Sequence, residues 1–301
     1  MKIVKQKVCV KKCCKCGKRI HGGYAHTIYC PHCSRFAVRM AAKKFSPEIV
    51  KQLWDDVRQH EGFFCHYTGM RLDMDDPHSP WYCVFDHWHP RDAKRIVLTS
   101  SLFNEMKSNL TEDEFWYIIK QLAHHRRLGK HVRKIRLSCW PGHVMPSDET
   151  GKRLKQYLLR EHKGSGCCAL CGKRVFVYNA KYCPRCAKFV ARLHSKGLPP
   201  ETIEETLEYV RQKHFTCFYS GIQLDLDDPK SPWYCVLDHW IPQDPGKIVL
   251  TCDLFNVMKS DLSEKEFWYY VLQLADYIEK GRPVRKMKLA YFWRLCPVED
   301  V

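Results

Sequence analysis

The sequence predicts an α+β fold built from two tandem copies of one small domain. Two observations predict it. The string Trp-Tyr-Cys-Val-x-Asp-His-Trp occurs at residues 81–88 and again at 233–240, and two Cys-x2-Cys pairs precede each occurrence. The spacing between matching residues changes only from 155 at the first cysteines to 152 at the string, which indicates a duplication with short loop changes and not a long repeat array. We therefore expect a single-chain pseudo-dimer, the covalent counterpart of a two-fold symmetric dimer.

The length and the position of glycine and proline fit two domains joined by a linker. A chain of 301 residues allows two domains. Several Pro and Gly residues gather between the repeated segments, from Pro141 to Gly166. We assign residues 1–139 to the first copy, 140–166 to the linker and 167–301 to the second copy.

The charge and the cysteine content restrict the partner and the compartment. The formal net charge of +17 predicts a polyanionic partner, because lysine and arginine side chains that neutralise phosphates release bound counterions. A membrane surface is the weaker alternative, since no run approaches the roughly 18 apolar residues of a spanning helix. The N-terminus lacks the apolar segment of a secretory signal, so we expect an intracellular protein, with no compartment indicated, and reduced thiols.

The first element of each copy is a predicted zinc ribbon, in which two turns each present a cysteine pair. Tetrahedral Zn²⁺ takes four thiolate or imidazole ligands, and one Cys-x2-Cys turn supplies two of them. Cys13 or Cys14 could pair with Cys16, and the repeat favours Cys13 because it aligns with Cys168. The predicted ligands of two structural zinc ions are Cys13, Cys16, Cys30 and Cys33, and then Cys168, Cys171, Cys183 and Cys186. Ordinary core cysteines, or a histidine such as His32 in place of one thiolate, are the alternatives.

Helices and short strands are predicted to follow the ribbon in the same order in both copies. A helix is expected over 34–45 and 187–196, and a second one from Ser46-Pro47-Glu48 onwards and over 200–214. Two β-like runs come next, at 82–84 and 96–98 in the first copy. The last helices open with capping boxes, Thr111-x2-Glu114 and Ser263-x2-Glu266.

The β-like runs carry the second motif of each copy. A run ending in Asp-His, a loop with a proline, a second run and then Asn-x2-Lys extend over residues 84–107 and again over 236–259. This order resembles the HNH (ββα-metal, His-Me finger) nucleases, in which a β-hairpin and one helix hold a single divalent ion. With the preceding cysteine pairs, the layout is similar to zinc-bearing homing and rare-cutting restriction endonucleases.

The resemblance implies a role for each residue of the motif. His87 and His239 would act as general bases, since a neutral histidine takes a proton from water near pH 7. Catalytic Mg²⁺, with Mn²⁺ as a substitute, would be held by Asp86 with Asn104 and by Asp238 with Asn256. Lys107 and Lys259 are candidates for phosphate contact, although solvated lysines are an equal alternative. His89 aligns with Ile241 and is not expected to be essential.

One departure from the resemblance is informative. Many zinc-bearing HNH domains have a second four-cysteine site around the hairpin. Here the corresponding positions read Cys65-x2-Thr68 and Ser100-x2-Phe103, then Cys217-x2-Ser220 and Cys252-x2-Phe255. Too few thiolates remain, so we predict one structural zinc per copy, with packing by Phe103, Phe255, Trp116 and Trp268 in place of the second.

Basic residues are predicted to contact DNA. A stripe at i, i+4 and i+8 lies on the helix after the ribbon in each copy, and such a helix fits the major groove. The stripe consists of Arg35, Arg39 and Lys43, and then Lys188, Arg192 and Lys196. The segments 133–136 and 285–288 are further candidates for phosphate contact. A solvated helix face is the alternative.

The sequence therefore predicts a monomeric, sequence-specific DNA endonuclease that hydrolyses both strands of a long, partly symmetric duplex, with one HNH site per strand. Both copies keep the Asp, His and Asn set, which favours double-strand cleavage over nicking. Two rivals remain. One is a non-catalytic zinc-ribbon protein that binds nucleic acid, and the other is a nuclease specific for branched structures.

Overall fold

The computed structural model describes residues 12–20, 28–90, 92, 94–138, 140, 166–175, 180–242, 244 and 246–286. These residues fall into two compact units. One unit contains the described residues up to Asn104 together with Pro283–Lys286, and the other contains those from Glu105 to Arg282. This division differs from the predicted domains at 1–139 and 167–301, because a helix from the first half of the chain packs on a helix from the second half within one unit. The predicted linker lies outside the described residues apart from Trp140 and Gly166.

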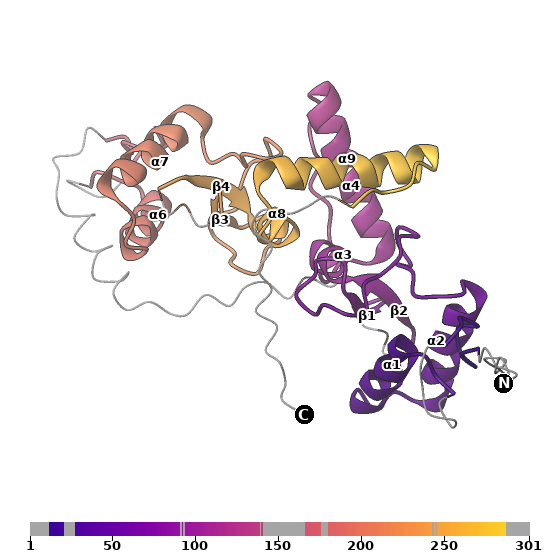
Figure 1. Cartoon of the computed structure of the whole chain (residues 1–301). Coiled ribbons are helices and arrows are strands. Elements are labelled where there is room, and N and C mark those ends of the chain that lie inside the picture. The colour runs from indigo at the N-terminus through magenta and orange to yellow at the C-terminus, as the bar shows by residue number, and fades with distance from the viewer. Residues whose placement is uncertain are drawn as a thin grey trace, which may run out of the picture. The chain divides into compact units, whose positions relative to one another are not determined.

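The first unit contains two helices, one hairpin and the start of a third helix (Figure 1). Its helices are α1 (Pro31–Ala42) and α2 (Pro47–Gln59), and its strands are β1 (Cys83–His87) and β2 (Ile96–Ser100), followed directly by α3 (Ser101–Lys107). The Ser46 side chain accepts a hydrogen bond from the Ile49 amide at the start of α2, as the Ser-Pro-Glu sequence predicts. Phe36 of α1 packs edge-on against Trp54 of α2 and against Phe63.

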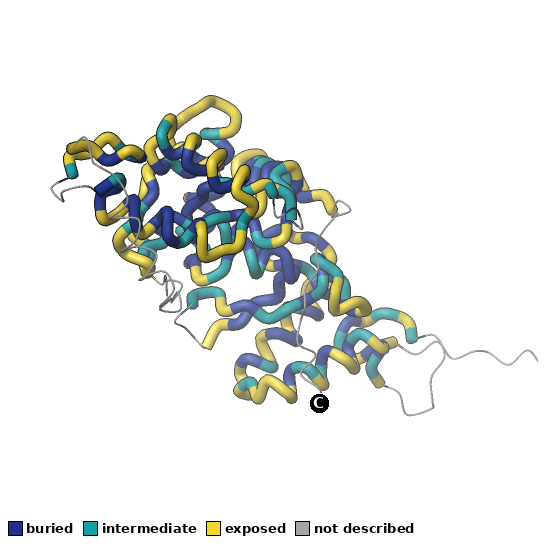
Figure 2. Tube along the Cα trace, turned by 90° about the vertical axis from the view of Figure 1, so that its left-hand side faces the viewer, coloured by how far each residue is buried: buried dark blue, intermediate teal, exposed yellow. Residues whose placement is uncertain are grey.

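The second unit begins within α3 and contains α4 (Glu112–Leu128) as well as the elements of the second half. These are α6 (Pro184–Ser195), α7 (Pro200–Lys213), β3 (Cys235–His239), β4 (Ile248–Cys252), α8 (Asp253–Lys259) and α9 (Glu264–Lys280). Both predicted capping boxes are present, at Thr111 with Glu114 and at Ser263 with Glu266, and the left-handed Gly129 and Gly281 end the same two helices. The longer helices carry both buried and exposed residues, so each of them buries one face, whereas α3 and α8 have no exposed residue (Figure 2).

The two hairpins have the same register. In β1–β2 the antiparallel pairs run from Cys83 opposite Ser100 to His87 opposite Ile96, and in β3–β4 from Cys235 opposite Cys252 to His239 opposite Ile248. Each second strand leads without a loop into a seven-residue helix, α3 or α8. In the second half, α8 packs on both β3 and β4. The order of elements from the cysteine pairs to the last helix is therefore the same in both halves.

The structure extends some predicted elements and moves others. The strands continue past the apolar runs through the Asp-His pair, to residues 87 and 239. The second cysteine pair does not lie in a ribbon turn as predicted: Cys30 and Cys183 are the N-caps of α1 and α6. Proline follows each N-cap cysteine and starts the helix earlier than predicted, at residues 31 and 184, since proline fits the first helical position. No described helix is long and apolar enough to cross a membrane.

Candidate functional site

Four thiols converge in each half of the chain. The sulfur atoms of Cys13, Cys16, Cys30 and Cys33 lie within 4.8 Å of one another, and so do those of Cys168, Cys171, Cys183 and Cys186. The Cys16–Cys30 and Cys171–Cys183 sulfur distances are 3.7 and 3.8 Å, far longer than a disulfide bond. Four thiolates placed tetrahedrally at the usual zinc–sulfur distance stand about 3.8 Å apart. The two sets could therefore hold two zinc ions, with the ligands predicted from the sequence.

The local sequence explains how each set is assembled. The first two cysteines lie on a tight turn closed by hydrogen bonds from the Gly17 amide to the Cys13 carbonyl (3.0 Å) and from the Gly172 amide to the Cys168 carbonyl (2.9 Å). Gly17 and Gly172 have φ values of +71° and +68°, which residues with a side chain rarely adopt. The other two cysteines come from the first turn of a helix. The Cys-x2-Cys-Gly string is thus needed for the shape of the turn as well as for its ligands.

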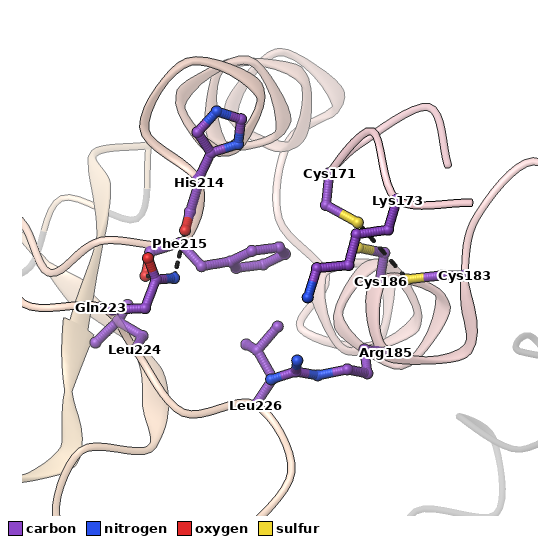
Figure 3. A pocket seen from close by; sticks show the side chains of 10 residues that line it. All are labelled: Cys171, Lys173, Cys183, Arg185, Cys186, His214, Phe215, Gln223, Leu224 and Leu226. Carbon is purple, nitrogen blue, oxygen red and sulfur yellow. Dashed lines mark hydrogen bonds between the residues drawn. The ribbon is translucent and has the colours of Figure 1, made fainter. Parts of the chain in front are cut away.

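A cavity of about 360 Å³ lies beside the second cysteine set (Figure 3). Lys173 and Arg185 line it together with Cys171, Cys183 and Cys186, while Phe215, Leu224 and Leu226 form its apolar part. A hydrogen bond with Cys186 lowers the pKa of the Cys168 thiol to about 4, and the same bond raises the pKa of the Cys186 thiol. One thiol of the set therefore ionises readily, and a bound metal would displace the protons that remain on the others. Four thiolates around Zn²⁺ would carry a net charge of −2, and the two cationic side chains would offset part of it. Arg185 also pairs with Asp227 at 3.0 Å.

The Asp-His pair ends the first strand of each hairpin. Asp86 and Asp238 are buried, with 8% and 6% of their surface exposed. The next residue in the strand points the other way, so His87 and His239 are exposed. Asn104 and Asn256 lie on α3 and α8 and are partly exposed. Each hairpin and its short helix thus present a buried carboxylate, an exposed imidazole and an amide.

A tyrosine that the sequence analysis did not select holds each carboxylate. The Tyr67 hydroxyl donates to Oδ2 of Asp86 at 2.5 Å, and the Tyr219 hydroxyl donates to Oδ2 of Asp238 at 2.6 Å. Both tyrosines are buried, 19 residues before their aspartates. The repeat contained a signal for them, since Cys-x-Tyr recurs at 65–67 and 217–219.

Lys107 and Lys259 are also buried, with no exposed surface. The Lys259 ammonium donates to Oδ1 of Asp238 at 3.2 Å and to the His239 carbonyl oxygen at 3.0 Å. Burial raises the pKa of Asp238, and the charge of Lys259 opposes that rise. The phosphate contact predicted for the two lysines does not fit their burial, because phosphate contact requires an exposed ammonium.

Comparisons with protein-family models, with curated proteins and with solved structures found no match.

The basic stripe is not a uniform solvent-exposed face. Arg39 donates to the Cys83 carbonyl oxygen at 2.6 Å and lies over the Tyr82 ring, and Arg192 donates to the Cys235 carbonyl oxygen at 2.7 Å. These two arginines fasten their helix to the first strand of the hairpin, so the DNA contact predicted for them is replaced by a structural one. Arg35 is exposed but pairs with Asp75. Lys43, Lys188 and Lys196 are exposed.

The eight positions that the sequence analysis compared with a second cysteine site are all buried. The Cys65 and Cys217 thiols lie 3.4 and 3.5 Å from the Thr99 and Thr251 hydroxyls of the hairpins. Phe103 and Phe255 are fully buried, and Trp116 and Trp268 nearly so. In the described part of the chain, the two four-cysteine sets are the groups that bring three or more possible metal ligands of the His, Cys, Asp and Glu types together.

Proposed function

We propose that the chain is a metal-dependent DNA endonuclease in which two copies of a zinc-stabilised HNH domain act as a pseudo-dimer. One observation supports this most. Both halves place a buried aspartate and an exposed histidine at the same end of an antiparallel hairpin that leads directly into a short helix bearing an asparagine. The net charge of +17 supports a nucleic-acid substrate.

The residues fit one divalent ion per site in the chemistry of their donors. Asp86 with Asn104, and Asp238 with Asn256, offer the hard oxygen ligands that Mg²⁺ prefers and leave positions for water and phosphate. Tyr219 and Lys259 each use one lone pair on a different oxygen of Asp238, so each oxygen keeps another. A bound ion would stabilise the charge that develops on the phosphate and on the leaving oxygen.

The protein groups supply the remaining steps. His87 and His239 are exposed, so water and a phosphate can reach them, and a neutral imidazole takes the proton from the attacking water. Tyr67 and Tyr219 each donate a hydrogen bond to the carboxylate that precedes the histidine, which limits the rotamers of that carboxylate. Lys259 neutralises part of the charge of Asp238 and ties its carboxylate to the His239 backbone.

The differences between the two halves favour an asymmetric, homing-type target over a symmetric restriction site. His32 and Arg35 of the first half correspond to Arg185 and Lys188 in the second, and His89 corresponds to Ile241. A duplicated chain can change one half alone, whereas a homodimer cannot.

The experiment is cleavage of a plasmid library with a randomised insert in Mg²⁺, with EDTA as the control and sequencing of the cut ends. The proposal predicts a defined, partly palindromic site cut on both strands, with no cutting in EDTA. Tight binding without cleavage would establish the non-catalytic binding protein instead. Scattered nicks at branched structures would establish a structure-specific nuclease.

A further inference from the structure

The contact between α4 and α9 joins corresponding helices of the two halves (Figure 1). Phe115-Trp116-Tyr117 of α4 matches Phe267-Trp268-Tyr269 of α9, so residues 152 positions apart correspond. By this rule His124 corresponds to Asp276, and Arg127 corresponds to Glu279. We call these four side chains the α4–α9 seam.

The ion pairs of the seam are reciprocal. Arg127 of α4 pairs with Asp276 of α9 at 2.9 Å, and His124 of α4 approaches Glu279 of α9 at 3.3 Å. In both pairs, the earlier seam residue of one helix (His124 or Asp276) contacts the later seam residue of the other helix (Glu279 or Arg127). An interface about a two-fold axis produces this exchange, in which residue i contacts j and j contacts i. Arg127 also donates to Glu279 at 3.2 Å and reaches the Leu272 carbonyl oxygen at 3.4 Å.

The aromatic residues beside the seam follow nearly the same exchange. Trp116 of α4 lies with its ring centroid 6.3 Å from that of Tyr277 on α9. Its counterpart Trp268 on α9 lies under the Arg126 guanidinium of α4, 5.1 Å from the ring centroid. Each tryptophan thus contacts the last turns of the opposite helix, as a pseudo-two-fold axis between α4 and α9 requires.

The charges break this symmetry in a consistent way. The seam positions on α4 are His124 and Arg127, whereas those on α9 are Asp276 and Glu279. The side chains of Arg127, Asp276 and Glu279 are only 28%, 26% and 24% exposed, so solvent screens their interaction incompletely. Two α4 helices packed in this geometry would set arginine against histidine, and two α9 helices would set aspartate against glutamate.

We propose that the seam is an interaction surface coded by charge: α4 accepts an α9 helix and rejects a second α4, and the reverse holds for α9. Like charges placed opposite each other penalise the wrong pairing while the correct pairing gains. The seam makes the two halves of one chain each other's partner and opposes assembly of chains through like halves. This goes beyond the nuclease proposal, because it concerns pairing and not chemistry.

The test uses full-length chains. An acidic-seam chain carries His124→Asp with Arg127→Glu, and a basic-seam chain carries Asp276→His with Glu279→Arg. A fourfold chain carries all four substitutions and restores opposite charges with the polarity reversed. Lys120→Glu, on an exposed position of α4, is the control for a charge change on the same helix. The readouts are melting temperature, hydrodynamic radius and mass by native mass spectrometry.

We expect the acidic-seam and basic-seam chains to melt at lower temperature and to have a larger hydrodynamic radius than the wild type. The fourfold chain should recover both properties, and the control should keep them. An equimolar mixture of the acidic-seam and basic-seam chains should give a complex of twice the mass, which neither forms alone. Wild-type melting and radius in the acidic-seam chain would overturn the proposal. A fourfold chain as impaired as the two twofold chains together would do so as well, even if the twofold chains fold poorly.

Discussion

The Tyr219 hydroxyl donates a 2.6 Å hydrogen bond to the buried carboxylate of Asp238, and the first half repeats this bond between Tyr67 and Asp86. The aspartate directly precedes the exposed histidine in the strand, and the hydrogen bond limits the orientations that its carboxylate can adopt. In the proposed nuclease the tyrosine would be a positioning residue in both halves.

Removing this hydroxyl should slow cleavage without unfolding the site. Tyr219→Phe keeps the ring and its edge-on contact with Phe267 but loses the bond to Asp238. We expect about 10–100-fold slower cutting of one strand, the usual effect of losing a partner behind a metal ligand. Strand-specific cleavage rates measure it, and Tyr67→Phe should slow the other strand. Equal slowing of both strands by either variant would contradict the separate positioning roles.

The buried ion pair between Lys259 and Asp238 predicts a stability effect. Lys259→Met leaves the carboxylate without its cationic partner, and breaking a buried pair on one side costs about 3–5 kcal/mol of unfolding free energy. Urea unfolding followed by tryptophan fluorescence measures the change. Lys265→Met, an exposed position on α9, is the matched control and should cost less than about 0.5 kcal/mol. Equal stability of the two variants would show that the pair contributes nothing.

Metal analysis of the purified chain should find two tightly held zinc ions. Cys33→Ser and Cys186→Ser should each reduce the content to one ion and lower the stability of that half, because zinc binding is coupled to folding. Cys14→Ser and Cys167→Ser change exposed cysteines directly beside the ligands and should retain both ions. A content of four ions would contradict the loss of the second cysteine sites.

The α4–α9 seam should weaken in acid. The Lys280 ammonium, followed by the Arg127 and Arg282 guanidinium groups, holds the pKa of Asp276 below its ordinary value. Glu279 is the other acidic group of the seam. A lowered folded-state pKa gives stability that is present above the ordinary value of about 4 and is lost as the pH falls through the lowered one. The unfolding free energy of the wild type should therefore exceed that of Asp276→Asn by less than about 1 kcal/mol at pH 6.

This difference should vanish at the acid end of the titration. Zinc loss affects both chains and cancels in the comparison. A difference that grew towards low pH would contradict the assigned sign.

Local signals in the sequence predicted local structure well. Ser46 and the two capping boxes lie at the predicted helix starts, because a cap depends on residues within one turn. The cysteine sets converge as predicted. The prediction selected Cys13 over Cys14 because the repeat aligns Cys13 with Cys168. The strands also fall at the predicted positions, although the Asp-His pairs belong to them.

Contacts between distant segments could not be read in this way. Helical spacing placed Arg39 on the basic face of α1 and Arg192 on the basic face of α6. It did not show that β1 and β3 lie against these two arginines. Lys107 and Lys259 resemble surface lysines in sequence and are buried in the fold. The packing of α4 on α9 depends on residues about 150 positions apart, and no periodicity in either helix indicates its partner.

Substitution of each candidate general base decides whether the chain carries two independent catalytic sites. The substrate is the target identified from the library, with both strands labelled. His87→Ala should leave a nicked product cut on one strand, His239→Ala should leave the opposite nick, and each missing cut should be slower by about 10²–10⁴-fold. His89→Ala, whose counterpart is Ile241, should still cut both strands. Double-strand cutting at the wild-type rate by either His87→Ala or His239→Ala would contradict the two-site nuclease.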